Sequence, residues 1–313
     1  MLPCLNLTPA SPAPTIESMT RASLFSRRHF LAMSASIGFA GVVAACGGKS
    51  NTSSSAEGSL QIVKRFPNEG LVPGSVRLPI SLGDKSGVLG VDSSVDLPEV
   101  LHASVIKPED GSVVLSGLTA NRHGENLSVA YWPFEFDIKE EGTYILRVDE
   151  APDSDAAFQI QKRSDVKMPL VGDSLPPFDT PTTDKARGVN PICTQQSGIC
   201  PFHTVTLTEA LKSGKPVLYL IGTPAYCSTG TCTPALDALI ETAKTLGDTA
   251  VFVHADVYTD KTATDAAPAV KAYNLSFEPI LYITDAKGVL VKRLDAVFDV
   301  KEMRAVLTAA GIS

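Results

Sequence analysis

The sequence predicts a multidomain protein in which an all-β sandwich precedes an α/β domain. Between residues 60 and 161, β-branched residues and turn clusters recur roughly every ten residues, and no helical period appears. From residue 207 onward, apolar runs of strand length alternate with segments of helical spacing, which favours a mostly parallel sheet with flanking helices. The length of 313 residues, with 44% hydrophobic and 19% charged side chains, fits two folded domains.

The N-terminal segment carries two consecutive targeting patterns. Arg27 and Arg28 precede an uncharged, mostly apolar stretch, which is shorter than a bilayer span of about 20 residues and ends in Val-Ala-Ala directly before Cys46. The first pattern resembles a twin-arginine export signal, and the second resembles a lipoprotein lipobox. The resemblance implies that Cys46 bears lipid and anchors the mature chain to the extracytoplasmic face of the cell membrane. Both Met1 and Met19 remain candidate start residues.

The β-rich part contains strands that are set off by turns. Residues 113–115 follow a Pro-Glu-Asp-Gly turn, and residues 144–148 follow Glu-Glu-Gly. The segment 141–144 resembles the entry to the last strands of immunoglobulin-like sandwiches, which implies a spacer or a binding platform. Trp132, the single tryptophan, is expected in the core of this part. A proline- and aspartate-rich stretch, residues 164–190, is expected to form an extended linker.

The α/β part is predicted element by element from apolar spacing and cap residues. Thr206 is a suitable N-cap, and Gly214 a suitable end, for a first helix. The continuous apolar run over residues 216–221 favours a buried central strand. The expected elements are helices 207–212, 235–246, 268–273 and 300–310, and strands 216–221, 250–257, 280–284 and 289–294.

Two segments of this part resemble the thioredoxin-like family. Residues 215–220, followed by 223–227, are similar to its first strand leading into a redox-active cysteine. Residues 277–282 are similar to the segment that carries the cis-proline of that family. The resemblance implies a thioredoxin-like fold over residues 191–313, with the element order β-α-β-α-β-β-α.

The resemblance also implies that Cys227 and Cys232 are the redox couple and that Pro279 faces their sulfurs. We expect Cys227 at the end of a strand and the start of a helix, where the helix dipole stabilises a thiolate. The C-x4-C spacing departs from the C-x2-C of thioredoxins. In a regular helix, Cα atoms five residues apart are about 8.6 Å apart, whereas a disulfide needs less than about 7 Å. The pair therefore requires a break in the helix, which Gly230 can supply.

A second departure concerns the proton acceptor of the couple. Thioredoxins have a buried aspartate six residues before the first cysteine, and this chain has Ile221 there. The nearest candidates to replace it are Glu278, beside the expected cis-proline, and His254. A carboxylate at position 278 is expected to lie close to Cys227 and to raise the pKa of its thiol.

The remaining cysteine pair, Cys193 and Cys200, is expected to form a small structural disulfide. A zinc or copper site that also uses His203 is an alternative, but the C-x6-C-x2-H pattern lacks a fourth ligand. An electron relay with Cys227 and Cys232 is a third possibility. We therefore expect neither a bound metal nor a cofactor.

These patterns divide the chain into five parts: a signal peptide (1–45), a flexible tether (46–58), an immunoglobulin-like sandwich (59–163), a linker (164–190) and a thioredoxin-like domain (191–313). The net charge of −7 offers no basic footprint for nucleic acid, and no nucleic-acid partner is expected.

The expected function is that of a membrane-anchored thiol–disulfide oxidoreductase. Its expected partners are exported proteins that contain cysteine or a membrane thiol reductant. A thiol peroxidase similar to Q-type peroxiredoxins is one alternative, because these also have C-x4-C after Thr-Pro. Their threonine stands three residues before the first cysteine, whereas Thr223 stands four before Cys227. A copper-handling protein and a plain binding lipoprotein are the non-enzymatic alternatives, in which Cys227 and Cys232 would form a structural disulfide.

Overall fold

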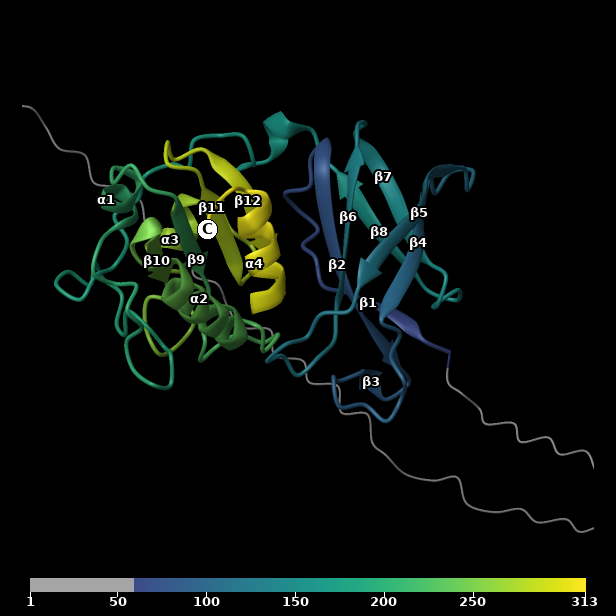
Figure 1. Ribbon diagram of the computed structural model, residues 1–313, viewed down its shortest axis with the longest axis horizontal. Coiled ribbons are helices and arrows are strands. Elements are labelled where there is room, and N and C mark those ends of the chain that lie inside the picture. The colour runs from purple at the N-terminus through teal and green to yellow at the C-terminus, as the bar shows by residue number, and fades with distance from the viewer. Residues whose placement is uncertain (1–58) are drawn as a thin grey trace, which may run out of the picture. The chain divides into compact units, whose positions relative to one another are not determined.

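The computed structural model describes residues 59–313 (Figure 1). The predicted export signal with Arg27 and Arg28, the predicted lipid-bearing Cys46 and the tether up to residue 58 lie outside the described residues. Among the residues from 59 onward, none of the helices combines the length and the apolar character that crossing a membrane requires.

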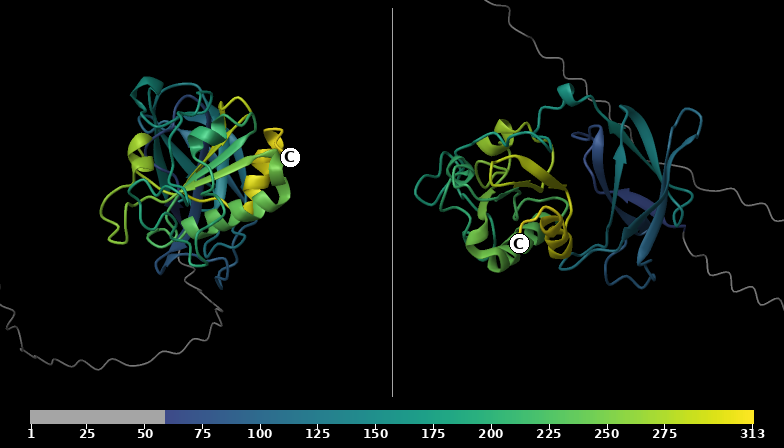
Figure 2. Two further views of the ribbon diagram at one scale, coloured as in Figure 1. Left: turned by 90° about the vertical axis from the view of Figure 1, so that its left-hand side faces the viewer. Right: turned by 45° about the horizontal axis from the view of Figure 1, so that its top comes forward.

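Two four-stranded antiparallel sheets form the N-terminal part and face each other across one core (Figures 1 and 2). In β6 and β8 buried and exposed side chains alternate, as expected for strands with one face toward a core. Trp132 is fully buried, as predicted. The β-rich character of this part is therefore confirmed. One sheet contains β1 (Gln61–Lys64), β2 (Gly74–Asp84), β3 (Gly87–Val88) and β6 (Trp132–Ile138); the other contains β4 (Val100–Ile106), β5 (Val113–Asn121), β7 (Gly142–Val148) and β8 (Asp155–Ile160).

The C-terminal part contains a third sheet, with strand order β10-β9-β11-β12. Strands β9 and β10 are parallel, and β11 runs antiparallel to both β9 and β12. Each predicted strand of this part is present, with its ends shifted by two residues or fewer. The strands are β9 (Val217–Ile221), β10 (Val251–Ala255), β11 (Ile280–Thr284) and β12 (Leu290–Asp295).

Helices cover both faces of this sheet (Figure 1). Leu218 and Leu220 of β9 pack in the core that contains α2 and α4, whereas Val217 and Tyr219 pack with α1 and α3. This two-residue alternation explains why the strand is apolar throughout. The four predicted helices are confirmed as α1 (Leu207–Leu211), α2 (Cys232–Leu246), α3 (Pro268–Ala272) and α4 (Val300–Ala309), and Thr206 caps α1 through a capping box. Two short 3₁₀ turns complete the fold, η1 (Arg163–Asp165) and η2 (Gly247–Thr249).

The stretch predicted as an extended linker packs against the third sheet. Met168 and Leu175 are buried in the core between that sheet and α1. The Gly172 N–H donates a hydrogen bond to Leu290 O, and the Leu290 N–H donates one to Asp173 O. These contacts hold the stretch along the edge strand β12.

A buried ion pair joins β2 to α4. Arg77 Nε lies 2.6 Å from Glu302 Oε1, and both side chains are only 7% exposed. The hydroxyl of Tyr131 donates a further hydrogen bond of 2.6 Å to Glu302. Because two charges are withdrawn from water here, each depends on its partner for compensation.

Candidate functional site

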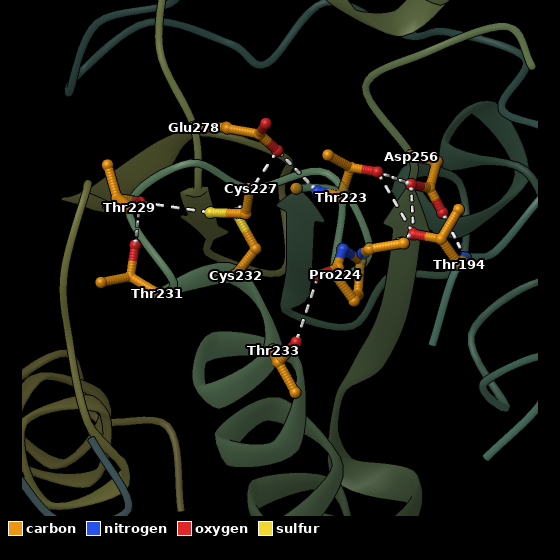
Figure 3. Close-up of a disulfide and its surroundings, with 12 residues drawn as sticks. Thr194, Thr223, Pro224, Cys227, Thr229, Thr231, Cys232, Thr233, Asp256 and Glu278 are labelled. Carbon is orange, nitrogen blue, oxygen red and sulfur yellow. Dashed lines mark hydrogen bonds between the residues drawn. A yellow bond between two sulfur atoms is a disulfide. The ribbon is translucent and has the colours of Figure 1, made fainter. Parts of the chain in front are cut away.

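Cys227, in the loop between β9 and α2, forms a disulfide with Cys232, the first residue of α2 (Figure 3). Their Cα atoms are 6.0 Å apart, a separation that a regular helix does not allow at this spacing. Helix α2 begins only at Cys232, and Gly230 adopts a φ of 70° in the left-handed region. Gly230 therefore provides the predicted break, because glycine takes this conformation without steric cost.

The two sulfurs of the couple have different surroundings. Cys232 is the first residue of α2 and is 1% exposed, whereas Cys227 lies in the loop and is half-buried. The expectation that Cys227 starts the helix is wrong, since four loop residues follow it before α2 begins. The positive end of the helix dipole consequently acts on Cys232. Cys227 is the sulfur that a partner molecule can reach.

Glu278 and Pro279 lie beside the buried sulfur. The Glu278–Pro279 peptide is cis, as the sequence predicts. Glu278 Oε2 accepts a hydrogen bond of 2.6 Å from the Thr223 N–H and lies 3.4 Å from Cys232 Sγ (Figure 3). A side chain on Gly222 would place its Cβ 3.2 Å from Pro279 Cβ and 3.6 Å from Cys232 Sγ, so glycine keeps these groups close. The predicted carboxylate therefore lies close to Cys227, within 4.8 Å of its sulfur, and it also lies within hydrogen-bond distance of Cys232 Sγ.

The environment of Glu278 changes its acidity. Burial raises the pKa of Glu278 from 4.5 to about 7, and the negative charge of Asp256 adds to this rise. The hydrogen bond from the Thr223 N–H and the charge of His254 act in the opposite direction. Near neutral pH, Glu278 can therefore both hold a proton and release it, which suits a group that exchanges protons with a thiol.

Asp256 is a site residue that sequence reasoning missed. It is 2% exposed and accepts hydrogen bonds from the Thr194 N–H at 2.7 Å, the Thr194 hydroxyl at 2.9 Å and the Thr223 hydroxyl (Figure 3). Burial raises the pKa of Asp256. Its signal in the sequence is an acidic residue directly after an apolar strand, at the sheet edge where ligand-binding loops gather. Through Thr223, Asp256 is linked to Glu278.

A second group of reactive side chains lies behind this network; we call it the thiol–imidazole cluster. Its members are Cys193, Cys200, His203 and His254. One atom of each residue, the sulfur of a cysteine or one ring nitrogen of a histidine, lies within 4.8 Å of the corresponding atoms of the other three, and all four residues are buried. The predicted disulfide between Cys193 and Cys200 is absent from the structure, where both cysteines are free. Each sulfur instead faces an imidazole, with His254 Nδ1 at 3.8 Å from Cys193 Sγ and 3.5 Å from Cys200 Sγ.

His254 belongs to the thiol–imidazole cluster and forms no hydrogen bond with Cys227, Cys232 or Glu278 among the residues that the structure describes. Burial lowers its pKa, but a hydrogen bond with Cys193 and the charge of Asp256 outweigh that effect and raise it. Hydrogen bonds from Cys200 and the two histidines lower the pKa of the Cys193 thiol, whereas the proximity of Cys193 raises that of Cys200. Of the two candidate proton acceptors, only Glu278 contacts the redox couple.

Comparison with known proteins identifies no family for this chain. No family model matches it, and no curated protein matches it. Among solved structures, a Salmonella alpha-2-macroglobulin mutant is 22% identical over 40% of this chain, with a TM-score of 0.24. This chain spans only 7% of the length of that protein. An overlap of this size supports no conclusion about fold or activity.

Proposed function

We propose that this protein is a membrane-anchored, extracytoplasmic thiol–disulfide oxidoreductase that acts through the Cys227–Cys232 couple. One observation carries the proposal: a disulfide with one reachable and one buried sulfur, in which the buried sulfur lies 3.4 Å from the Glu278 carboxylate. A partner thiol can thus attack Cys227, and Glu278 can donate a proton to the leaving sulfur of Cys232. Disulfide exchange requires both.

The C-terminal part is proposed to be a thioredoxin-like domain. The element order β9-α2-β10-α3-β11-β12-α4 matches the order expected for that fold, and the cis-proline at position 279 stands beside Cys232. The two antiparallel sheets of the N-terminal part are proposed to form an immunoglobulin-like sandwich. In this arrangement the sandwich serves as a spacer or a binding platform, and the chemistry belongs to the loop before α2.

The proposed reaction starts from the oxidised couple. A thiolate of the partner protein attacks Cys227 Sγ, a mixed disulfide forms, and the bond to Cys232 breaks. Cys232 leaves as a thiolate and takes the proton of Glu278, which becomes a carboxylate. A second thiolate of the partner then attacks the partner sulfur that is bound to Cys227. The new disulfide forms within the partner, and Cys227 is released as a thiolate. Two electrons have then passed from the partner dithiol to the couple, and the partner contains a new disulfide.

The same steps in reverse reduce a partner disulfide. The direction follows from the reduction potential of the couple relative to that of its partner. The proposed partners are exported proteins that contain cysteine, or a membrane thiol reductant. The predicted lipid on Cys46 would hold the couple at the membrane surface, where both are present.

Trapping of the mixed disulfide tests the proposal. The purified chain is reduced and mixed with an oxidised protein substrate, and covalent complexes are identified by mass spectrometry. The Cys232→Ser variant should accumulate a complex through Cys227, because the resolving thiol is missing. The Cys227→Ser variant should accumulate at least about ten-fold less, because its remaining thiol is buried.

A matched control is Glu209→Gln, a carboxylate on α1 whose capping function glutamine can maintain. This variant should undergo disulfide exchange at the same rate as the parent. Equal trapping by both cysteine variants would contradict the proposal. If hydrogen peroxide oxidises the reduced couple at least about ten-fold faster than protein disulfides do, the result would instead support a thiol peroxidase.

A further inference from the structure

The thiol–imidazole cluster has a hydrogen-bond arrangement that leaves two nitrogen lone pairs facing each other. His254 Nε2 lies 2.9 Å from Gly222 O, and His203 Nδ1 lies 3.3 Å from Pro181 O. Because a carbonyl oxygen only accepts hydrogen bonds, each of these nitrogens carries the ring proton. In the neutral rings, His254 Nδ1 and His203 Nε2 are then both unprotonated, and they are only 3.1 Å apart. A positive centre between them is required to remove the repulsion.

The three separations that start from His254 Nδ1 are close to the edges of a coordination tetrahedron. With zinc–nitrogen bonds of about 2.05 Å and zinc–sulfur bonds of about 2.3 Å, ideal edges are about 3.3 Å between nitrogens and about 3.6 Å between sulfur and nitrogen. The cluster has 3.1 Å between its two facing nitrogens, and 3.5 and 3.8 Å from His254 Nδ1 to the two sulfurs. A shared proton would satisfy the nitrogens alone, whereas a metal ion engages all four side chains.

The groups around the cluster resemble those that orient metal ligands. Both imidazoles donate their outer N–H to a backbone carbonyl, which fixes the tautomer and the ring orientation. The Cys200 N–H donates a hydrogen bond of 3.5 Å to Cys193 Sγ. Backbone donors of this kind stabilise a thiolate, the form in which cysteine binds a metal.

Charge distinguishes the metals that could bind here. Zn²⁺ with two thiolates and two neutral imidazoles has no net charge, which suits a site in which His203 and His254 are 0% exposed. Cu⁺ with the same ligands would leave one negative charge. That charge would lie close to Asp256, which is itself buried two residues from His254. Four protein ligands and full burial are typical of a structural zinc site, which has no open position for a substrate.

We propose that the thiol–imidazole cluster binds one structural Zn²⁺ ion. The ion would join the segment before α1 to strand β10, and the hydrogen bond of His254 to Gly222 O would extend this support to the loop that follows β9. It would also keep Cys193 and Cys200 reduced in an oxidising compartment, because thiolates bound to zinc are unavailable for disulfide formation. The site is separate from the Cys227–Cys232 couple, and its function does not depend on the activity of that couple.

Metal analysis of matched cysteine variants tests this proposal. The full chain is purified without added metal, and zinc and copper are measured by inductively coupled plasma mass spectrometry. We expect one zinc per chain in the parent and in the Cys227→Ser/Cys232→Ser variant, and none in the Cys193→Ser/Cys200→Ser variant. The Cys227→Ser/Cys232→Ser variant is the control. It also removes two cysteines, but these lie near Glu278 and are not part of the thiol–imidazole cluster.

Two measurements on the parent decide the question if the second variant does not fold. Titration of the metal-stripped chain with Co²⁺ should give the absorption bands of tetrahedral, thiolate-bound cobalt, and Zn²⁺ should abolish them. Alkylation of Cys193 and Cys200, followed by mass spectrometry, should become at least about ten-fold faster after a chelator removes the metal. A Cys193–Cys200 disulfide in the isolated protein, copper in place of zinc, or zinc that is lost with Cys227 and Cys232 would overturn the proposal.

Discussion

The carboxylate of Glu278 lies 3.4 Å from the sulfur of Cys232, the buried member of the disulfide. In the reduced protein, the Cys232 thiol can donate a hydrogen bond to this carboxylate. Burial raises the pKa of Glu278 to about 7, so that its protonation state changes in the pH range where thiols and disulfides exchange. This contact leads to the first two predictions.

Glu278→Gln should change the pH dependence of disulfide opening. Below pH 7, protonated Glu278 can give its proton to the leaving Cys232 thiolate, and glutamine cannot. We expect opening by a small thiol, at a fixed thiolate concentration, to be about ten-fold or more slower in the variant at low pH. The parent rate should fall as the pH rises through about 7, and the variant should lack this fall. Rate profiles of parent and variant that remain parallel would contradict a proton-donor role.

Glu278→Gln should also change stability in a defined pH window. The folded pKa is about 7, above the ordinary value of 4.5, so the folded state holds an extra proton between these values. The contribution of Glu278 to stability is therefore largest below pH 4.5 and is lost as the pH rises to about 7. The variant should become more stable relative to the parent across this window, by at most about 3 kcal/mol. Urea unfolding of both proteins at several pH values measures the difference, and a constant difference would be incompatible with the raised pKa.

Cys227 should be the first thiol to react in the reduced protein. It is half-buried in the loop, whereas Cys232 is 1% exposed at the start of α2. Brief alkylation near neutral pH, followed by peptide mass spectrometry, should find the label on Cys227. Labelling of Cys232 before Cys227 would reverse the roles of the attacked and the leaving sulfur.

Arg77→Met should destabilise the protein by about 3–5 kcal/mol, because it leaves Glu302 buried without its charged partner. Denaturant unfolding measures the loss. Arg304→Met is the matched control, since the Arg304–Glu241 pair is exposed by 48% and 44% and should contribute less than about 1 kcal/mol. Similar losses in the two variants would show that burial does not set the strength of the Arg77–Glu302 pair.

Cys46→Ala should abolish membrane anchoring. In a bacterial host, the parent should fractionate with membranes because of the predicted lipid on Cys46, and the variant should become soluble or remain unprocessed. Immunoblots of membrane and soluble fractions measure the distribution. A cleaved variant without lipid that stays entirely in the membrane fraction would contradict the anchor.

Local patterns in the sequence determined the elements of the C-terminal part. Cap residues and apolar spacing predict its four helices and four strands, with ends within three residues of those observed. The C-x4-C spacing also predicts a break before α2, because helix geometry excludes a disulfide between residues five apart. These features depend on neighbouring residues alone, which is why they can be read without a structure.

Only the tertiary structure decided how the side chains of the two sites meet. His254 is 61 residues from Cys193 in the chain, and it joins the thiol–imidazole cluster because β10 pairs in parallel with β9, with His254 opposite Leu220. No spacing in the sequence supplies this fourth candidate ligand. Likewise, the start of α2 places Cys232 Sγ within hydrogen-bond distance of the Glu278 carboxylate, which the sequence predicts only to lie near Cys227. Such contacts depend on strand register and on where a helix begins in space, and local propensity specifies neither to within a hydrogen-bond length.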